Sequence, residues 1–388
     1  MSTRLHILLV EDSDSDADLL IRFLKRENID FSHSRVWDKP SFITALHENN
    51  LDLIIADHSL PQFSGMEAFR IAKSENIRIP FILVTGTVTE NVLIEYAKEG
   101  VDDYILKDNL LRLPSAIDHV LSKKKIEDLS KNLEIVLKDL NDSINYAKRI
   151  QNAMLPDTAL LHDCFPESFI FFRPKDVLSG DFYWFKNDGN TFFAAAADCT
   201  GHGIPGALMS MIGIEKLNSS VLTTKLPSEI LKQLNKNIVF ALSQSNQYEH
   251  SFDGMDIALC SINIDTLILH FAGANRPLWI VRNNTIEEIK GTKQAIGGIS
   301  TMLTPNFESI EIQLYKGDTF YMFSDGFADQ FGGESDKKLL SKNFKQLLLS
   351  MQGLLMSEQE IHLLQFIETW KATTDQIDDI LVIGIRIV

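Results

Sequence analysis

The sequence is poor in cysteine and has no long uninterrupted apolar segment. Its three cysteines, Cys164, Cys199 and Cys260, are odd in number and lack metal-site spacing, so we expect no disulfide framework and a reducing, cytoplasmic location. No stretch approaches the roughly 18 consecutive apolar residues of a membrane span. The first residues also lack the apolar core of a signal peptide. We therefore expect no membrane partner.

Basic residues are also scarce. The 37 lysines and arginines are outnumbered by 53 aspartates and glutamates, which gives a formal net charge of −16. Such a chain is repelled by nucleic acid, so we do not expect nucleic acid as a partner. The 388 residues are 45% hydrophobic and 23% charged, which is typical of globular protein and is enough for two domains and a linker.

The amino-terminal third alternates short apolar runs with segments of helical period. The apolar runs end on polar residues: Glu11-Asp12, Asp57, Thr85 and Lys107. Strands that alternate with helices predict a doubly wound parallel α/β sheet. The functional site of such a sheet lies at the carboxyl ends of its strands, which is where these polar residues fall.

This pattern resembles the response-regulator receiver domain over residues 4–122, and we assign residues 1–122 to that domain with a five-stranded parallel sheet. The resemblance implies that Asp57 is the phosphate acceptor and that Glu11 and Asp12 hold Mg²⁺ with it. It also implies three switch residues that respond to the phosphate: Thr85, Tyr104 and Lys107. Chemistry agrees, because a carboxylate that attacks phosphorus needs cations to offset the charge. The phosphodonor would be a sensor histidine kinase or a phosphotransfer protein.

Residues 123–156 carry a heptad pattern that predicts a helical coiled-coil linker. The seam consists of nine positions that are alternately three and four residues apart: Ile126, Leu129, Leu133, Val136, Leu140, Ser143, Ala147, Ile150 and Met154. The favoured interpretation is a parallel two-stranded coiled coil that makes a homodimer. The alternative is a single amphipathic helix that packs on its own domain.

Residues 157–388 contain four aspartates that begin or end apolar runs, namely Asp181, Asp198, Asp325 and Asp378. Such positions place carboxylates at the rim of a buried sheet, where they repel one another unless a cation lies between them. Because the set offers only oxygen, with no histidine or cysteine at ligand spacing, it indicates Mg²⁺ or Mn²⁺ rather than zinc.

Five motifs in this part resemble the bacterial metal-dependent (PPM-type) serine/threonine protein phosphatases of the stage II sporulation protein E branch, over about residues 145–388. They are Ser-Gly-Asp-Phe-Tyr at 179–183, Asp-x-x-Gly-His-Gly at 198–203, Ala-Gly-Ala-Asn at 272–275, Ser-Asp-Gly-Phe-Ala-Asp at 324–329 and Asp-Asp-Ile-Leu-Val at 378–382. The resemblance implies an α+β fold, a β-sandwich flanked by helices. We expect helices at 205–221 and 227–243, which correspond to the family's switch helices, and helical structure over 339–371.

The resemblance also implies roles for individual residues. Asp198 would bridge two metal ions, Mn²⁺ or Mg²⁺, and the Cys199 carbonyl would bind one of them. Asp325 and Asp378 would complete one site and Asp181 the other, and the metals would clamp a phosphoryl group and activate a water. Three residues are accessory candidates: Lys175, His202 and Asp379. Asn275 stands where the family usually has histidine and is interpreted as a turn residue. The arginine that binds phosphate in eukaryotic relatives has no clear counterpart.

Together these patterns predict a response regulator whose aspartyl phosphorylation controls dephosphorylation of phosphoserine or phosphothreonine on a partner protein. By family analogy, that partner would be an anti-sigma-factor antagonist. Two alternatives remain. The second domain could be a catalytically weak module that binds a phosphoprotein, although its four retained aspartates count against this. The chain could also be a scaffold that acts through receiver dimerisation alone.

Overall fold

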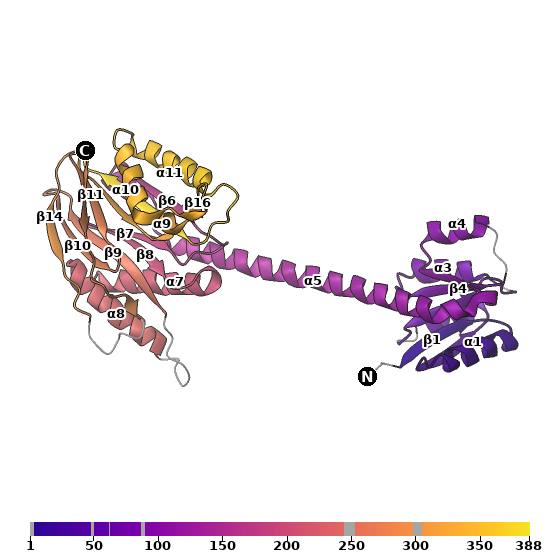
Figure 1. Cartoon of the computed structure of the whole chain (residues 1–388). Coiled ribbons are helices and arrows are strands. Elements are labelled where there is room, and N and C mark those ends of the chain that lie inside the picture. Colours follow the sequence, from indigo (N-terminus) through magenta and orange to yellow (C-terminus); the bar gives the residue numbers. More distant parts are fainter. Residues whose placement is uncertain (1–3, 48–49, 62, 87–89, 244–252, 298–304) are drawn as a thin grey trace. The chain divides into compact units, whose positions relative to one another are not determined.

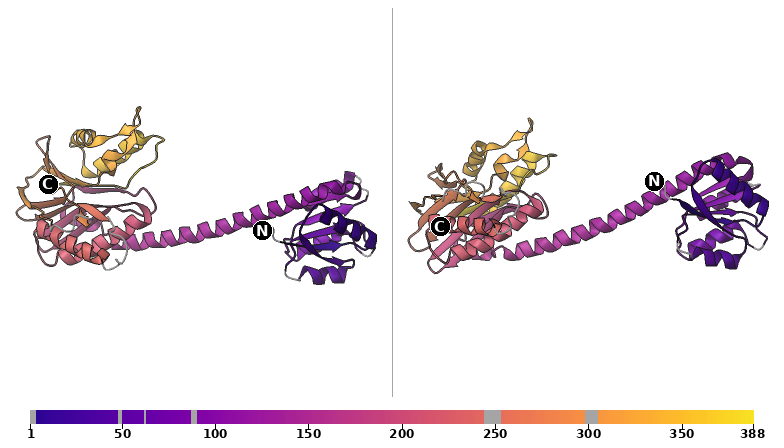
Figure 2. Two further views of the ribbon diagram at one scale, coloured as in Figure 1. Left: turned by 60° about the horizontal axis from the view of Figure 1, so that its bottom comes forward. Right: turned by 90° about the horizontal axis from the view of Figure 1, so that it is seen from below.

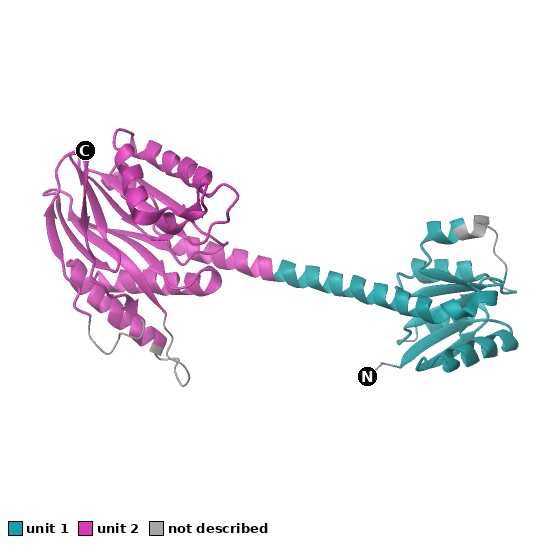
Figure 3. Ribbon diagram, viewed as in Figure 1, with its two compact units in different colours: residues 1–139 teal, residues 140–388 magenta. Residues whose placement is uncertain are grey.

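The computed structural model describes residues 4–388 except 48–49, 62, 87–89, 244–252 and 298–304 (Figure 1). It divides into two compact units, residues 1–139 and 140–388, which are described separately below (Figure 3). One helix, α5 (Leu113–Met154), begins in the first unit and ends in the second. Among the described residues, no helix combines the length and the apolar character needed to cross a bilayer.

The first unit is built on a parallel sheet with strand order β2-β1-β3-β4-β5, which confirms the predicted five-stranded receiver-like sheet. Its strands are β1 (Leu5–Val10), β2 (Phe31–Val36), β3 (Leu53–Asp57), β4 (Phe81–Thr85) and β5 (Asp103–Leu106). Its helices are α1 (Asp14–Arg26), α2 (Lys39–Leu46), α3 (Gly65–Ser74), α4 (Glu90–Glu99) and the short 3-10 helix η1 (Lys107–Arg112), followed by α5.

Helices cover both faces of this sheet. On one face, Leu20 and Leu24 of α1 pack with Leu113 and Ile117 of α5. On the other face lie buried side chains of α2, α3 and α4. Strands β3 and β4 are therefore buried along their whole length, and this explains why their sequences are continuous apolar runs. The first turns of α5 belong to this core, so the long helix begins at Leu113, upstream of the heptad pattern.

The second unit is a sandwich of two sheets, which confirms the predicted architecture. One sheet has the order β14-β10-β9-β8-β7, with β13 paired to β9, and the other has the order β12-β11-β15-β18-β6. The strands of the first sheet are β7 (Phe182–Asp188), β8 (Thr191–Cys199), β9 (Gly254–Asn263), β10 (Ile268–Ala274), β13 (Ile296–Gly297) and β14 (Ile310–Gln313). Those of the second are β6 (Ser168–Arg173), β11 (Leu278–Arg282), β12 (Thr285–Ile289), β15 (Thr319–Phe323) and β18 (Ile380–Arg386).

Helices lie on both outer faces of the sandwich (Figures 1 and 2). Helices α7 (Gly203–Ser220) and α8 (Pro227–Ser243) pack on the first sheet. Helices α10 (Leu340–Ser350) and α11 (Met356–Lys371) pack on the second. The remaining short elements are α6 (Ala159–Cys164), α9 (Gly326–Asp329), β16 (Phe331–Gly332) and β17 (Lys337–Lys338).

Strand β8 shows why this arrangement suits the sequence. Phe192 and Ala194 face the core between the two sheets, whereas Phe193 and Ala195 face the layer of α7 and α8. Both faces of the strand are apolar because both are covered. The helical stretch expected over 339–371 is divided, because residues 351–355 form a turn between α10 and α11.

Candidate functional site

The receiver residues meet at the carboxyl ends of the parallel strands. Carboxylate oxygens of Glu11, Asp12 and Asp57 all lie within 4.8 Å of one another, which is a spacing that can hold a metal ion. Lys107 Nζ lies 2.9 Å from Asp57 Oδ2 and 3.5 Å from Glu11 Oε2. Thr85 ends β4, the neighbour of the strand that ends on Asp57. The structure thus brings the candidate acceptor, its candidate metal ligands and Lys107 together.

Asp16 of α1 is an additional member of this site that the sequence did not single out. Its carboxylate accepts a hydrogen bond from Lys107 Nζ, so the ammonium is shared between Asp16 and Asp57. This hydrogen bond holds the pKa of Asp16 below its ordinary value. Burial disfavours the charged form of Lys107, but its bonds to Asp16 and Asp57 outweigh that effect and raise its pKa. Glu11 is buried, and burial raises its pKa.

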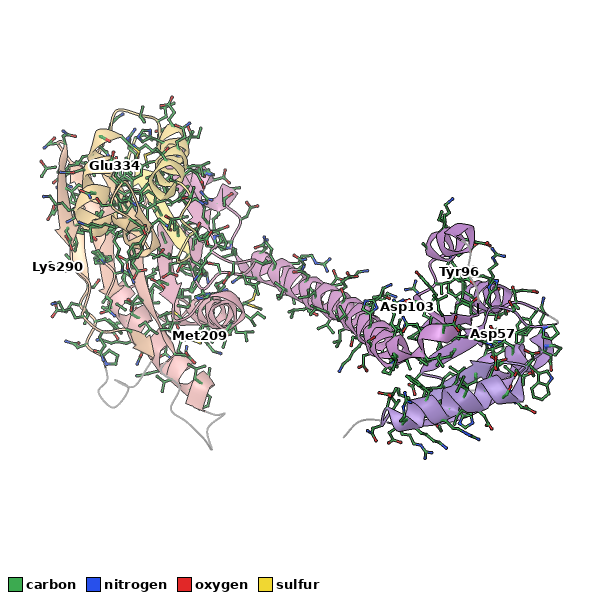
Figure 4. The ribbon with its side chains drawn as sticks, turned by 45° about the vertical axis from the view of Figure 1, so that its right-hand side comes forward. Asp57, Tyr96, Asp103, Met209, Lys290 and Glu334 are labelled. Atoms are coloured by element: carbon green, nitrogen blue, oxygen red, sulfur yellow. The ribbon has the colours of Figure 1, made fainter. Side chains whose placement is uncertain are left out.

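A chain of aromatic side chains leads away from the acceptor. His58 follows Asp57, and its Nδ1 lies 2.5 Å from the hydroxyl of Tyr96 on α4. Figure 4 shows Asp57 and Tyr96 in the receiver unit. Burial raises the pKa of Tyr96 to about 12, so its hydroxyl stays protonated near neutral pH. The ring of Tyr96 also contacts that of Tyr104, the candidate switch residue, with 6.2 Å between centroids.

In the second unit, five aspartates gather at one end of the sandwich around a single arginine. Asp198 ends β8, and Asp256 of β9 stands directly opposite it in the sheet register. Arg276, which follows β10, places its Nη2 atom 2.9 Å from Asp198 Oδ2, 3.2 Å from Asp256 Oδ2 and 2.6 Å from Asp325 Oδ2. Asp181 and Asp378 complete the group through their charge interactions with these aspartates.

Close packing of glycine backbone holds the segments that carry Asp181 and Asp198 together. A Cβ atom on Gly180 would lie 2.6 Å from the Gly201 carbonyl oxygen and 3.3 Å from that of Cys199. On Gly206, in the first turn of α7, it would lie 2.3 Å from the same Gly201 oxygen. Any side chain at these two positions would force the segments apart. The Ser-Gly-Asp motif and the Gly-rich turn after Asp198 are therefore one packed unit.

The carboxylates are held in an environment that disfavours their charge. Burial, and then the charge of Asp198, raises the pKa of Asp181 well above its ordinary value. Burial raises the pKa of Asp198 to about 7, with Arg276 opposing the rise and Asp325 adding to it. Burial also raises the pKa of Asp378. Asp181 is buried and the other carboxylates are partly buried, so this group around one arginine is short of positive charge.

The donor set fits Mg²⁺ or Mn²⁺ on two observations. All of its side-chain donors are carboxylate oxygens, which hard divalent cations prefer. In addition, Asp181 Oδ2 is buried without a hydrogen-bond partner among the described residues, so one lone acceptor is left for a cation. The Cys199 thiol is buried, and burial raises its pKa well above the ordinary value, which leaves the backbone carbonyl as the donor that Cys199 can offer.

Three accessory candidates have defined partners. Both carboxylate oxygens of buried Asp379 accept backbone N–H groups, from Lys175 at 2.7 Å and from Gly180 at 2.7 Å, so Asp379 fastens the segment before Asp181. Burial raises the pKa of Asp378, and the positive charge of Lys175 opposes this rise. His202 Nδ1 lies 2.8 Å from Asp176 Oδ2 in a half-exposed pair at the start of α7.

Asp256 and Arg276 are functional candidates that the sequence analysis missed. Asp256 interrupts the apolar run of β9, and a charged residue in a buried strand requires a partner. That interruption was a usable signal, whereas nothing local marked Arg276. Asn275 is a turn residue, as predicted, because it has a φ of 59°. Its side-chain amide also donates to Asp256 Oδ1 at 2.7 Å.

A glutamine in the last turns of α5 forms hydrogen bonds with two segments of this site. Gln151 is buried, and its Nε2 donates to the Ser179 carbonyl at 2.6 Å and lies 2.9 Å from Ser210 Oγ of α7. Its Oε1 accepts the Ser179 N–H at 3.2 Å. The end of the heptad helix is thus bonded to the segment that carries Asp181 and to the helix that follows Asp198.

The raised pKa values of the second unit's aspartates predict that, in the absence of metal ions, the stability of this unit decreases as the pH rises. Asp181, Asp198 and Asp378 have raised pKa values in the folded state, so the folded state binds their protons more tightly than the unfolded chain. Their protonation stabilises the folded state fully below the pKa of about 3.9 that an aspartate has in the unfolded chain. This stabilisation is lost as the pH rises through the pKa values of the folded state. In chelator, the free energy of unfolding of the second unit should therefore fall between about pH 4 and the Asp198 pKa of about 7.

Denaturant unfolding followed by tryptophan fluorescence measures this dependence. Asp198→Asn removes one titrating group and should flatten the slope, and saturating Mn²⁺ should also flatten it in the unsubstituted protein. Equal slopes for the unsubstituted and Asp198→Asn proteins in chelator would contradict the prediction.

Comparison with known proteins supports the division of the chain. The sequence model of the family described as Stage II sporulation protein E (SpoIIE) matches residues 188–388, and that of the response regulator receiver domain matches residues 7–118. The chain belongs to the SpoIIE family. Its first unit is a response-regulator receiver domain, and its second unit is a phosphatase domain of the PP2C-like type.

Individual relatives agree with this assignment. The SiaA-PP2C domain of Pseudomonas aeruginosa is 30% identical, with a TM-score of 0.60, over 65% of this chain and 99% of that domain. The phosphoserine phosphatase RsbU of Bacillus subtilis is 31% identical over 160 residues, which are 40% of this chain and 44% of that protein. The transcription factor SKN7 of Candida albicans is 29% identical over 126 residues, 31% of this chain and 22% of that protein. The chain thus spans less than half the length of these two curated relatives.

Proposed function

We propose that the second unit hydrolyses phosphoserine or phosphothreonine on a partner protein in a metal-dependent reaction, and that phosphorylation of Asp57 controls it. The observation that carries the proposal is the convergence of Asp181, Asp198, Asp325 and Asp378 at one end of the sandwich, with too little positive charge to balance them. This is a site that favours a cation and, through it, a phosphate.

The metal site would use the residues that the geometry offers. Asp198 would be shared by two ions of Mn²⁺ or Mg²⁺, Asp181 and the Cys199 carbonyl would serve one side, and Asp325 and Asp378 the other. Bound ions would supply Lewis acidity at phosphorus and lower the pKa of water. The chain's own contribution is to hold these carboxylates in place, through Gly180, Asp379 and the packed turn after Asp198.

The substrate class follows from relatives rather than from the site. RsbU, which is 31% identical over its matched part, is named as a phosphoserine phosphatase. By analogy with the family, the partner would be an anti-sigma-factor antagonist that carries a phosphorylated serine or threonine. The phosphodonor for Asp57 would be a sensor histidine kinase or a phosphotransfer protein.

A second copy of the chain is the proposed partner of α5. The large apolar seam residues from Ile126 to Ile150 are 40% to 67% exposed in the single chain, which leaves an apolar stripe uncovered. A parallel coiled coil would bury it. Because Gln151 bonds both the Asp181 segment and α7, a change in the pitch or register of α5 would reach the metal site directly.

A phosphopeptide assay tests the proposed activity. The full chain should release phosphate from a phosphoserine peptide with Mn²⁺ or Mg²⁺ and should stop in chelator. A protein that binds the peptide without turnover under all metal conditions would instead be the catalytically weak binding module. If a truncation lacking residues 160–388 kept full biological function, the chain would be a dimerisation scaffold.

Insertions in α5 test the proposed coupling. Three or four residues added after Leu140 rotate or unwind the seam, so the phosphatase rate should lose its dependence on Asp57 phosphorylation. Seven residues preserve the phase of the stripe and should restore much of the dependence. The measurement is the rate with and without acetyl phosphate for each insertion. Unchanged regulation in all three proteins would make the helix a passive tether.

A further inference from the structure

The backbone that carries Arg276 is fixed by close packing. Asn275 occupies the left-handed region, and the Arg276 N–H donates to the Ala274 carbonyl at 2.7 Å. A Cβ atom on Gly273 would lie 2.2 Å from the Arg276 carbonyl oxygen, and one on Gly291 would lie 2.6 Å from it. The two glycines thus allow the turn after β10 and the segment around Gly291 to pack closely at this residue. This packing restricts the position of the Arg276 backbone and therefore of its Cβ atom.

The three carboxylates around Arg276 are not equivalent. Asp198 and Asp325 belong to the set proposed to hold metal ions, whereas Asp256 does not. One oxygen of Asp256 accepts from Asn275 Nδ2 at 2.7 Å, and the other lies 3.2 Å from Arg276 Nη2. Asp256 is therefore oriented by the same turn that precedes Arg276. Asp256 can therefore still bind the Arg276 guanidinium when Asp198 and Asp325 bind metal ions instead.

The Arg276 guanidinium also has an N–H donor that lacks an acceptor among the described residues. Nη2 makes all three carboxylate contacts, while the Nε atom is buried without a hydrogen-bond partner among the described residues. A buried N–H without an acceptor is unfavourable, and an incoming anion would relieve it. Guanidinium groups bind phosphoryl oxygens through two adjacent N–H donors, and Nε with a terminal nitrogen makes such a pair.

We propose that Arg276 is the phosphoryl-binding residue of this phosphatase and that Asp256 is its anchor. In the metal-free protein Arg276 neutralises Asp198 and Asp325, so it competes with metal ions for them. Once those aspartates hold metal, Arg276 stays on Asp256 and donates to a phosphoryl oxygen of the substrate. This inference rests on the proposed function, and it supplies a phosphate-binding arginine, for which the sequence motifs offer no clear counterpart.

Calorimetric titrations of the full-length protein test the inference with Mn²⁺ alone and with inorganic phosphate. Arg276→Gln removes a competitor, so Mn²⁺ should bind the phosphatase site about tenfold more tightly. At saturating Mn²⁺ the same variant should bind inorganic phosphate about tenfold more weakly, since it lacks the charged donors. The receiver metal site contributes equally to all titrations. Arg282→Gln, on the next strand, removes an arginine paired to Asp318 and should change neither constant.

Arg276→Lys separates phosphate recognition from simple charge balance. Lysine keeps the positive charge, so Mn²⁺ affinity should stay near that of the unsubstituted protein while phosphate binding is still weakened. If Lys restores phosphate binding fully, or if Arg276→Gln leaves both constants unchanged, the inference is overturned. Absence of any second-unit Mn²⁺ binding in the unsubstituted protein would overturn the proposed phosphatase site itself and this inference with it.

Discussion

Replacing Asp198 with asparagine is expected to abolish hydrolysis of a phosphoserine peptide. Asp198 stands opposite Asp256 in the sheet register, and its Oδ2 lies 2.9 Å from Arg276 Nη2. Removing its charge would remove the ligand proposed to be shared by two ions, and metal ions contribute several kcal/mol to the transition state of such reactions. We therefore expect kcat to fall on the order of a thousandfold or more.

The matched control is Asp329→Asn, which makes the same chemical change near the end of the same motif as Asp325. Asp329 is partly exposed, and its Oδ2 accepts a hydrogen bond from Lys338 at 2.7 Å rather than from Arg276. It should keep near-normal turnover. The Asp198→Asn protein should still fold and accept phosphate on Asp57, which excludes a general loss of structure. Full activity of Asp198→Asn in Mn²⁺ would refute the two-metal site.

Replacing Asp57 with alanine is expected to remove all labelling of the chain by acetyl phosphate. Asp57 lies beside Lys107 and within metal-ligand distance of Glu11 and Asp12, so it combines a nucleophilic oxygen with the cations that offset charge on phosphorus. The unsubstituted protein should take up one phosphate in a Mg²⁺-dependent way. Intact mass, together with the lability of the phosphate label to base and hydroxylamine that marks an acyl phosphate, measures this uptake.

Two further variants serve as a control and as a test of the switch. Asp18→Ala removes an exposed aspartate of α1 that pairs only loosely with Arg22, and it should label normally. Lys107→Ala should keep some label but blunt the effect of phosphorylation on phosphatase rate, because the ammonium that contacts Asp57 is gone. Label that persists on a second carboxylate in Asp57→Ala would show that the acceptor lies elsewhere.

The sequence predicted the fold well because its signals were local and repeated. Apolar runs with polar ends placed four of the five parallel strands, and the fifth, β2, followed from the resemblance to the receiver domain. The predicted helix at Pro227–Ser243 has the bounds found in the structure. Heptad spacing also located α5. It did not show that the helix begins at Leu113, because the first turns pack in the receiver core and follow no heptad seam.

The candidate site was predicted less completely, and the missing residues share a physical reason. Asp256 and Arg276 are 20 residues apart and meet only because β9 and β10 pair as neighbours. Asp16 reaches Lys107 across 91 residues. Such pairs depend on tertiary register, which residue patterns do not encode locally. Motifs such as Ser-Asp-Gly identified the carboxylates, but the cation that balances them came from elsewhere in the chain.

The hydrogen bonds of Gln151 also determine where a stable catalytic fragment of this protein can begin. A fragment that starts at residue 157, where the sequence places the domain boundary, would lack the side chain that bonds Ser179 and Ser210. Each buried polar group left without its partner costs about 1–3 kcal/mol, and the loss would fall on the segment beside Asp181. A catalytic fragment should therefore begin near Leu140, where the second compact unit starts. By the same reasoning, a foreign sensor should be fused to α5 upstream of this glutamine and in phase with the helix.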